Sequence, residues 1–154
     1  MDKYPASIKL IVEKQITIWH EILSISREKL HLVTKDGLDL NIEQLNLLLL
    51  QQQERIEAID ALNREKEAEF KKLDQVGIKM TCLKATPEYQ KAEDEIRKIA
   101  LLIRENDNII ESQIRQLQQQ IQTKLWSFRE NKKAKQIYLQ DNYSNEGWFI
   151  DQKK

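Results

Sequence analysis

Apolar residues recur every three or four positions along most of this chain. The longest row of this kind reads Leu38, Ile42, Leu45, Leu49, Gln52, Ile56, Ile59, Asn63, Lys66, Phe70 and Leu73. Steps of three and four place side chains along one side of an α-helix. We therefore predict a helix over about 40–75, roughly 50 Å long at 1.5 Å per residue. A helix of that length needs partners along its apolar side.

Two further rows flank this segment. The earlier row, which includes Val12, Ile16, Trp19 and Leu23, predicts a helix over about 7–35 with Ser7 as its N-cap. The later row follows Thr86-Pro87, a typical helix start, and predicts a helix over about 87–133. Its members are Tyr89, Ala92, Ile96, Ile99, Ile103, Asn106, Ile110, Ile114, Leu117, Ile121, Leu125 and Phe128.

The connection between the first two predicted helices is short. Gly37 suits a positive φ just past a helix end, and Asn41 with Gln44 resembles a capping box, with Asp39 as the competing cap. A short connection makes the two helices antiparallel neighbours. The second half of the second helix, 64–72, is nearly all charged, so we expect it to project into solvent or to form a thinner seam.

The predicted fold class is all-α: a long antiparallel helical hairpin plus a long third helix, arranged as a coiled coil or helical bundle. The sequence holds only 3 Gly and 2 Pro, which is typical of long helices with few turns. The periodicity fades after Lys135. We therefore predict a helical bundle domain over 1–135 and an irregular C-terminal tail over 136–154.

Charge and composition narrow the function. The chain has 25 basic and 25 acidic residues, whereas a nucleic-acid-binding protein usually carries a basic excess. No nucleic-acid partner is expected. A single cysteine, Cys82, suits a reducing compartment. No apolar run approaches the roughly 20 residues of a membrane span, and the N-terminus lacks a signal-peptide pattern. These features predict a cytoplasmic protein without membrane insertion.

Catalytic and metal-binding motifs are absent from the sequence. His20 and His31 lie eleven residues apart on one predicted helix, so about 16 Å separates them along its axis. Glu28 and His31 form one Glu-x-x-His pair, but Thr17 stands where a second pair would need its glutamate. We therefore expect no enzyme, no catalytic residue, no metal and no cofactor. A metalloprotein or enzyme built on a bundle is the weakest interpretation.

The C-terminal stretch carries a family resemblance. Its pattern comprises Lys132-Lys133, Tyr138, Tyr143, and the close Gly147-Trp148-Phe149-Ile150-Asp151-Gln152-Lys153-Lys154. This resembles the C-terminus of Firmicute-type FliT flagellar export chaperones, although Gln152 departs from a purely basic ending. The segment 53–60, with Arg55, Ile56 and Ile59-Asp60, is similar to the corresponding part of FliT and of the related FlgN chaperones.

The resemblance implies a small, cytoplasmic, helical chaperone. Such proteins bind a late flagellar export substrate, for FliT the filament-cap protein FliD, and deliver it to the type III export gate and its ATPase. The C-terminal segment of the family can cover the partner surface. Carried over to this chain, the residues of a partner-binding or self-masking tail would be Tyr138, Tyr143, Gly147, Trp148, Phe149 and Asp151.

Three long helices are one short of a four-helix bundle, so the remaining place could take a substrate helix, the chain's own tail or a second protomer. The candidate apolar partner surface consists of Trp19, Leu117, Ile121, Leu125 and Phe128. A homo-oligomer is expected. The alternatives are a homo-oligomeric coiled-coil scaffold or adaptor without an export role, and a FlgN-type chaperone for hook-junction proteins.

Overall fold

The structure is a computed structural model that describes the backbone of residues 4–153 and the side chains of residues 4–139. Its helices are α1 (Ala6–Asp36), α2 (Ile42–Gln75), the short α3 (Met80–Lys84) and α4 (Pro87–Lys153), with a 3₁₀ turn at Gly37–Asp39. The described residues contain no strand, and the predicted all-α class with a long hairpin and a further long helix is confirmed. The chain divides into two compact units, Met1–Gln113 and Ile114–Lys154.

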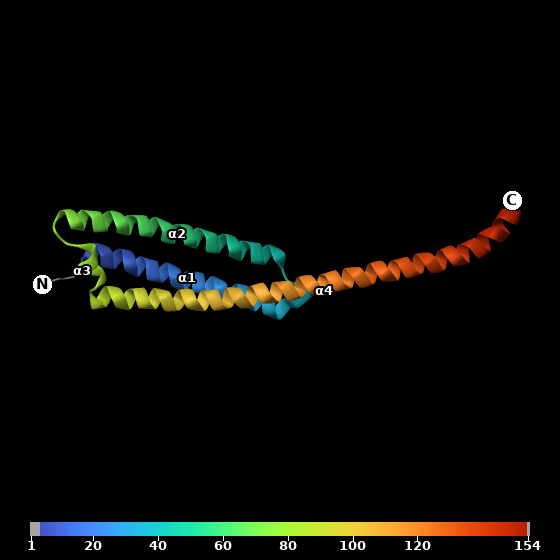
Figure 1. The fold of residues 1–154 in the computed structure, drawn as a ribbon, viewed down its shortest axis with the longest axis horizontal. Helices are drawn as coiled ribbons and strands as arrows, with labels where there is room; N and C mark the ends of the chain where they lie inside the picture. The colour runs from blue at the N-terminus through green and yellow to red at the C-terminus, as the bar shows by residue number, and fades with distance from the viewer. Residues whose placement is uncertain (1–3, 154) are drawn as a thin grey trace. The chain divides into compact units, whose positions relative to one another are not determined.

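The first unit is built from α1, α2, α3 and the part of α4 before Ile114. Figure 1 shows α1, α2 and this part of α4 running side by side, with the short α3 at the end where α2 connects to α4. Ile8 near the start of α1 packs with Phe70 near the end of α2, and Leu32 packs with Leu48. These pairs make α1 and α2 antiparallel, as the short connection predicted. Ile8 also packs with Tyr89, so α4 starts beside the start of α1 and runs parallel to it.

Three clusters of buried side chains form the core of this unit. The cluster at the N-terminal end of α1 consists of Ile8, Val12, Phe70, Leu83 and Tyr89. The middle cluster consists of Ile22, Leu23, Ile59, Ile99 and Ile103, contributed by three helices. The third consists of Ile25, Leu32 and Leu48, with Leu40 and Leu45 packed against it. Burial of this apolar surface is the main stabilising contribution, at about 25 cal/mol per Å².

The apolar row predicted for α2 is partly wrong. Ile42, Leu49 and Ile56 are exposed, whereas Leu48 is buried. Other members of the predicted row do face the core. Phe70 is buried, and the members spaced by seven are buried or half-buried: Leu45, Gln52, Ile59, Lys66 and Leu73. The helix therefore turns its Leu48 side inward rather than its Leu49 side, and it leaves a second apolar row exposed.

The charged second half of α2, 64–72, was expected to project into solvent or to form a thinner seam, and the structure shows a thin seam. Phe70 is its one buried side chain, Lys66 and Glu69 are half-buried, and the other side chains of this range are exposed. Phe70 is 5% exposed and Leu73 packs beside it on the cluster around Ile8 and Tyr89. Two edge-to-face ring contacts reinforce the packing: Tyr89 lies 6.1 Å from Tyr4 and 6.2 Å from Phe70, measured between ring centroids. Phe70 thus anchors the segment 64–72, most of whose other side chains are exposed to solvent.

The apolar row predicted for α4 is buried or half-buried from Tyr89 to Leu117. Asn106, the polar member of the row, is half-buried. The neighbouring Asp107 forms an ion pair with Lys29 of α1. The Lys29 ammonium lies 3.5 Å from the Asp107 carboxylate, and the Lys29 side chain is only 5% exposed. A buried lysine requires such a partner because an unpaired buried charge is costly.

The helix ends follow the predicted chemistry in part. The Asn41 side chain accepts a hydrogen bond of 3.1 Å from the Gln44 backbone N–H, as a capping box requires. Gly37 adopts a φ of 54°, which favours glycine. Ser7 is not the cap of α1, because the helix already begins at Ala6 with Pro5 as its N-cap. Ser7 therefore lies within the first helical turn.

The C-terminal helix is longer than predicted. The periodicity predicted a helix to about 133 and an irregular tail over 136–154, whereas α4 extends to Lys153. Residues 134–139 contain no proline or glycine and include strong helix formers such as Ala134, Lys135 and Leu139. Local propensity can therefore continue the helix after its apolar periodicity has faded.

Candidate partner-binding surfaces

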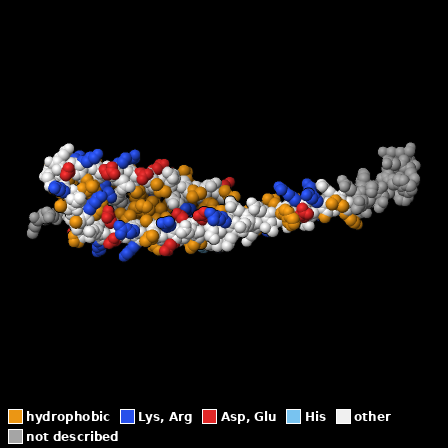
Figure 2. Space-filling model, viewed as in Figure 1, with side chains coloured by type: hydrophobic (Ala, Val, Ile, Leu, Met, Phe, Trp, Pro, Cys, Tyr) orange, Lys and Arg blue, Asp and Glu red, His pale blue; other side chains and the backbone are white. Residues whose placement is uncertain are grey.

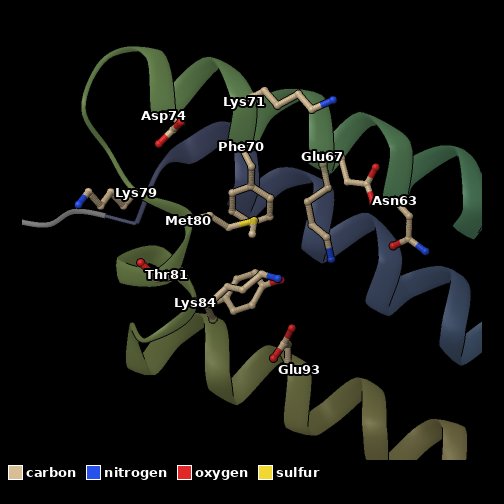
Figure 3. Close-up of a pocket in the computed structure, with 12 residues that line it drawn as sticks. Asn63, Glu67, Phe70, Lys71, Asp74, Lys79, Met80, Thr81, Lys84 and Glu93 are labelled. Carbon is tan, nitrogen blue, oxygen red and sulfur yellow. The ribbon is translucent and has the colours of Figure 1, made fainter.

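A cavity of about 780 Å³ opens among α2, α3 and the start of α4. Figure 3 shows Phe70, Met80 and Glu93 converging on it from these three elements. Tyr89 lines the cavity beside Phe70, and the surrounding charged residues are Lys66, Glu67, Lys71, Asp74, Lys79, Lys84 and Glu93. The arrangement has an aromatic base and a charged border, which suits an amphipathic protein segment better than a small polar substrate.

A smaller cavity of about 280 Å³ continues this hollow along the same helices. The two cavities share Asn63, Lys66 and Glu93. The smaller one adds Gln15 and Trp19 from α1, so α1 supplies the base of the hollow. Figure 2 shows hydrophobic side chains gathered between α2 and α4 on the face in view. We call this feature the α2–α4 groove.

A polar network crosses the groove. The Gln15 side-chain amide donates a hydrogen bond of 2.7 Å to Asn63 Oδ1, and the Lys66 ammonium donates one of 3.3 Å to Gln15 Oε1. Gln15 is only 2% exposed. Both functional groups of its amide are therefore paired, which is what allows a glutamine to be buried at little cost. The network fixes how α1 and α2 are aligned.

Burial changes the acid–base behaviour of two residues of the groove. Desolvation lowers the pKa of the Lys66 ammonium below its usual value of 10.5. The same ammonium lies 5.8 Å from the centroid of the Tyr89 ring, close enough for a cation–π interaction. Burial, followed by the charge of Glu93, raises the pKa of the Tyr89 hydroxyl. Both residues are held in the groove by packing and by partners on other elements.

The second unit presents a different kind of surface, within its described residues 121–139. Every side chain of this segment is exposed. Its large apolar residues are Ile121, Leu125, Trp126, Phe128, Ile137, Tyr138 and Leu139, with exposed fractions between 47% and 67%. Its charged residues are Lys124, Arg129, Lys132, Lys133, Lys135 and the single acid Glu130. We call it the cationic apolar segment.

The residues predicted as partner sites belong to both units. Trp19 is half-buried in the α2–α4 groove of the first unit. Leu117, in the second unit, is half-buried, whereas Ile121, Leu125, Phe128 and Tyr138 are exposed. The predicted tail residues Tyr143, Gly147, Trp148, Phe149 and Asp151 lie outside the residues whose side chains the structure describes.

Sequence reasoning missed most of the groove. Phe70, Met80 and Tyr89 come from three elements, and no spacing in the sequence indicates that they converge. One signal was available, because Asn63 and Lys66 are two consecutive polar members of a mostly apolar row. Polar residues at such positions often mark a side-chain network between helices. In the structure both contact Gln15, a position on α1 that no pattern in the sequence connects with them.

The described residues offer little to other kinds of site. No group of three or more potential ligands there is arranged to hold a metal ion. His20 Nε2 lies 3.4 Å from a Glu95 carboxylate oxygen, and the Cys82 thiol is exposed. None of the described helices is long and apolar enough to cross a membrane. The groove and the cationic apolar segment therefore remain the candidate sites.

Comparison with known proteins adds no relative. No protein-family model matches the chain, and no curated protein or solved structure is significantly similar to it.

Proposed function

We propose that this protein is a cytoplasmic helix-binding chaperone of the FliT kind rather than an enzyme. It would bind a late flagellar export substrate, with the filament-cap protein as the first candidate, and release it to the type III export gate and its ATPase. The FliT-like C-terminal pattern supports the choice of family. The observation that carries the binding role is the exposure of all seven large apolar residues of the cationic apolar segment.

The physical basis of this proposal is the cost of an uncovered amphipathic helix. Isolated helices in water are marginal, and most helix stability in proteins comes from packing of an apolar side. Ile121, Leu125 and Phe128 continue the row that α4 buries further upstream, yet they are 47%, 49% and 65% exposed. A partner helix laid along this row would bury it, which is the helix-in-groove mode of recognition.

Binding energy would concentrate on the aromatic members of the segment. Phe128, which is 65% exposed, lies on this row, and such residues dominate most measured interfaces. Trp126 is equally exposed but lies two residues away, so it faces a different side of the helix. The α2–α4 groove, with Trp19 half-buried in it, provides a second apolar surface on the first unit. Both surfaces suit an amphipathic helix of the partner.

Calorimetric titration with synthetic C-terminal helices tests the proposal. Helices from the filament-cap protein and from the hook-junction proteins of the same genome are titrated into the full chain. Binding of the cap helix alone, at about micromolar Kd or tighter, supports the FliT kind of chaperone. Binding of the junction helices alone would assign it to the FlgN kind. If no helix binds to either the full chain or a chain ending at Lys135, the scaffold alternative is favoured.

A matched pair of variants locates the binding surface. The double variant Leu125→Ser/Phe128→Ser should weaken binding of the cap helix at least about tenfold. The control is Leu102→Ser/Ile109→Ser, which removes two apolar residues of α4 that are 43% and 46% exposed in the first unit. Equal weakening by both variants would argue against a specific site on the second unit.

The predicted masking role of the tail needs a separate comparison. If residues 136–154 cover the partner surface, deleting them should tighten binding of the cap helix. Unchanged or weaker binding would contradict masking and would favour a direct contact between these residues and the partner.

A further inference from the structure

The exposed side of α2 carries a further apolar surface between residues 42 and 60, formed by other residues than the α2–α4 groove. Ile42, Leu47, Leu49, Leu50 and Ile56 are between 38% and 64% exposed. Contiguous exposed aliphatic side chains on one helix are unusual for a soluble monomer and mark interaction surfaces. Leu48, by contrast, faces the core, so these residues are not needed to hold α2 on α1.

The charge of this α2 surface is negative. Residues 42–60 contain Glu43, Glu54, Glu57 and Asp60, all of them exposed, and a single cation, Arg55. The Arg55 guanidinium donates a hydrogen bond of 2.6 Å to a Glu21 carboxylate oxygen on α1, so its charge is already matched within the first unit. We call residues 42–60 the acidic apolar segment.

The cationic apolar segment, 121–139, is complementary to it. Five of its residues are basic and one is acidic, whereas 42–60 has four acidic residues and one basic residue. Both segments have the same number of residues and would each span about 28 Å as helices. Each segment has exposed large apolar residues, and the two segments carry net charges of opposite sign.

Pairing each segment with its own kind is electrostatically unfavourable. Two copies of 121–139 side by side would place five cations against five cations, and two copies of 42–60 would place four carboxylates against four. Like charges at such distances repel, and helices use this repulsion to reject wrong partners. Pairing 121–139 with 42–60 replaces that repulsion with attraction while burying apolar residues of both.

We propose that the cationic apolar segment of one copy packs lengthwise against the acidic apolar segment of a second copy. Each chain carries both segments, so two copies can exchange this contact reciprocally, and the same residues then meet twice. The contact assigns a role to the exposed residues of α2, which the proposed chaperone function leaves unused. It also covers 121–139, so a second copy and an export substrate compete for that segment.

Charge reversal on one segment at a time breaks the contact. In the variant Lys124→Glu/Lys132→Glu/Lys133→Glu, 121–139 becomes acidic and repels 42–60. In the variant Glu54→Lys/Glu57→Lys/Asp60→Lys, 42–60 becomes basic and repels 121–139. Sedimentation analysis of the full chain from about 1 to 100 μM at low salt should show self-association for the original sequence. Each variant alone should self-associate at least about tenfold more weakly.

Mixing the two variants provides the decisive measurement. The acidic 121–139 of the first variant matches the basic 42–60 of the second, and the unaltered segments match each other as before. The equimolar mixture should therefore associate more strongly than either variant alone. The control Lys9→Glu/Lys91→Glu/Lys98→Glu alters the net charge as the first variant does, at exposed positions of the first unit, and should associate like the original sequence.

Three outcomes would overturn the proposal: a monomer at every concentration, association that neither variant weakens, or a variant mixture that remains monomeric. Circular dichroism checks that the variants retain their helix content. Should a variant lose it, cross-linking of isotope-labelled with unlabelled original chains decides instead, because the proposal requires links between Glu54 or Glu57 of one copy and Lys124 or Lys132 of another. No export substrate is used, so failure here is distinct from failure of the chaperone proposal.

Discussion

The two parts of α4 follow the same apolar row but differ in what covers it. Between Pro87 and Gln113 the row is buried or half-buried, with Tyr89 and Ile99 packed in two clusters of the first unit. From Ile121 to Leu139 every side chain is exposed. Apolar residues spaced by three and four therefore specify which side of a helix is apolar. Whether that side is buried depends on the other elements that pack against it.

The two units also differ in charge. Residues 114–154 contain eight basic and four acidic residues, and the remainder of the chain contains 17 basic and 21 acidic residues. The zero net charge of the chain therefore conceals two units of opposite sign. Electrostatic complementarity of this kind steers association and selects partners more than it adds affinity.

Hydrogen exchange should show the largest contrast between the two parts of α4. Amides between residues 96 and 110 lie on the packed core, so they should exchange at least about 100-fold more slowly than amides between residues 121 and 139. The measurement is mass-spectrometric hydrogen exchange on the full chain at low concentration. Equal protection along α4 would mean that the second part is covered in solution.

Replacing an isoleucine by alanine should lower the free energy of unfolding far more in the first unit than in the second. Ile22→Ala removes a side chain that is 2% exposed, and it should lower the free energy of unfolding by about 2–5 kcal/mol. Ile121→Ala, at a side chain that is 47% exposed, should change it by less than about 0.5 kcal/mol. Urea unfolding monitored by circular dichroism measures both. Similar losses would contradict the contrast.

Replacing a buried and an exposed glutamine by alanine should show a smaller difference in stability of the same kind. Gln15→Ala removes the partner of Asn63 and of the Lys66 ammonium, which should cost about 1–3 kcal/mol. Gln118→Ala, on the exposed part of α4, should cost close to nothing because alanine is a good helix former. Urea unfolding is again the readout. A neutral Gln15→Ala would show that water replaces the lost hydrogen bonds.

Alkaline pH should change the stability of the first unit, and the shifted pKa values of Tyr4, Tyr89 and Lys66 give the direction of each contribution. Burial, followed by the charge of Glu88, raises the pKa of Tyr4 from 10.0 to about 12, and burial also raises that of Tyr89. A raised tyrosine pKa contributes stability that is present below pH 10 and is lost as pH rises through the folded value. The lowered pKa of Lys66 acts oppositely, because the cost of burying its charge is relieved as it deprotonates.

The tyrosine contribution can be isolated by comparing variants. Tyr89→Phe should reduce the decline of stability between about pH 10 and 12, measured as the urea midpoint at each pH. Tyr138→Phe, whose ring is 67% exposed in the second unit, serves as the control. If both variants follow the original profile, the decline does not come from Tyr89.

Much of the helical layout could be predicted from the sequence alone. The row on α4 predicted which residues are buried or half-buried as far as Leu117, because it continues unbroken along one side of the helix, whereas Leu101, Leu102 and Ile109 beside it are isolated and exposed. The Asn41 cap could be recognised because its hydrogen bond to Gln44 spans three residues. Both features depend on neighbours in sequence, which is why periodicity and propensity were sufficient.

The inward side of α2 could not be predicted in the same way. Leu47, Leu48, Leu49 and Leu50 are four consecutive leucines, so a period of three and four can be continued through either Leu48 or Leu49. The structure buries Leu48, which packs with Ile25 and Leu32 of α1. Choosing between equal side chains required the position of α1, and this choice leaves Ile42, Leu49 and Ile56 exposed.

The sequence by itself thus determined the three long helices, the short connection between the first two, and the opposite charges of the two parts, because these follow from local spacing and composition. It did not indicate α3 or the C-terminal extent of α4. Only the tertiary structure decided which apolar rows are covered, since burial depends on residues distant in sequence. It also brought Phe70, Met80 and Tyr89 together around one cavity and paired Gln15 with Asn63. The exposed apolar residues of 42–60 lie beside Leu48, the leucine that α2 turns toward α1, and those of 121–139 belong to the second unit, where every described side chain from Ile121 on is exposed.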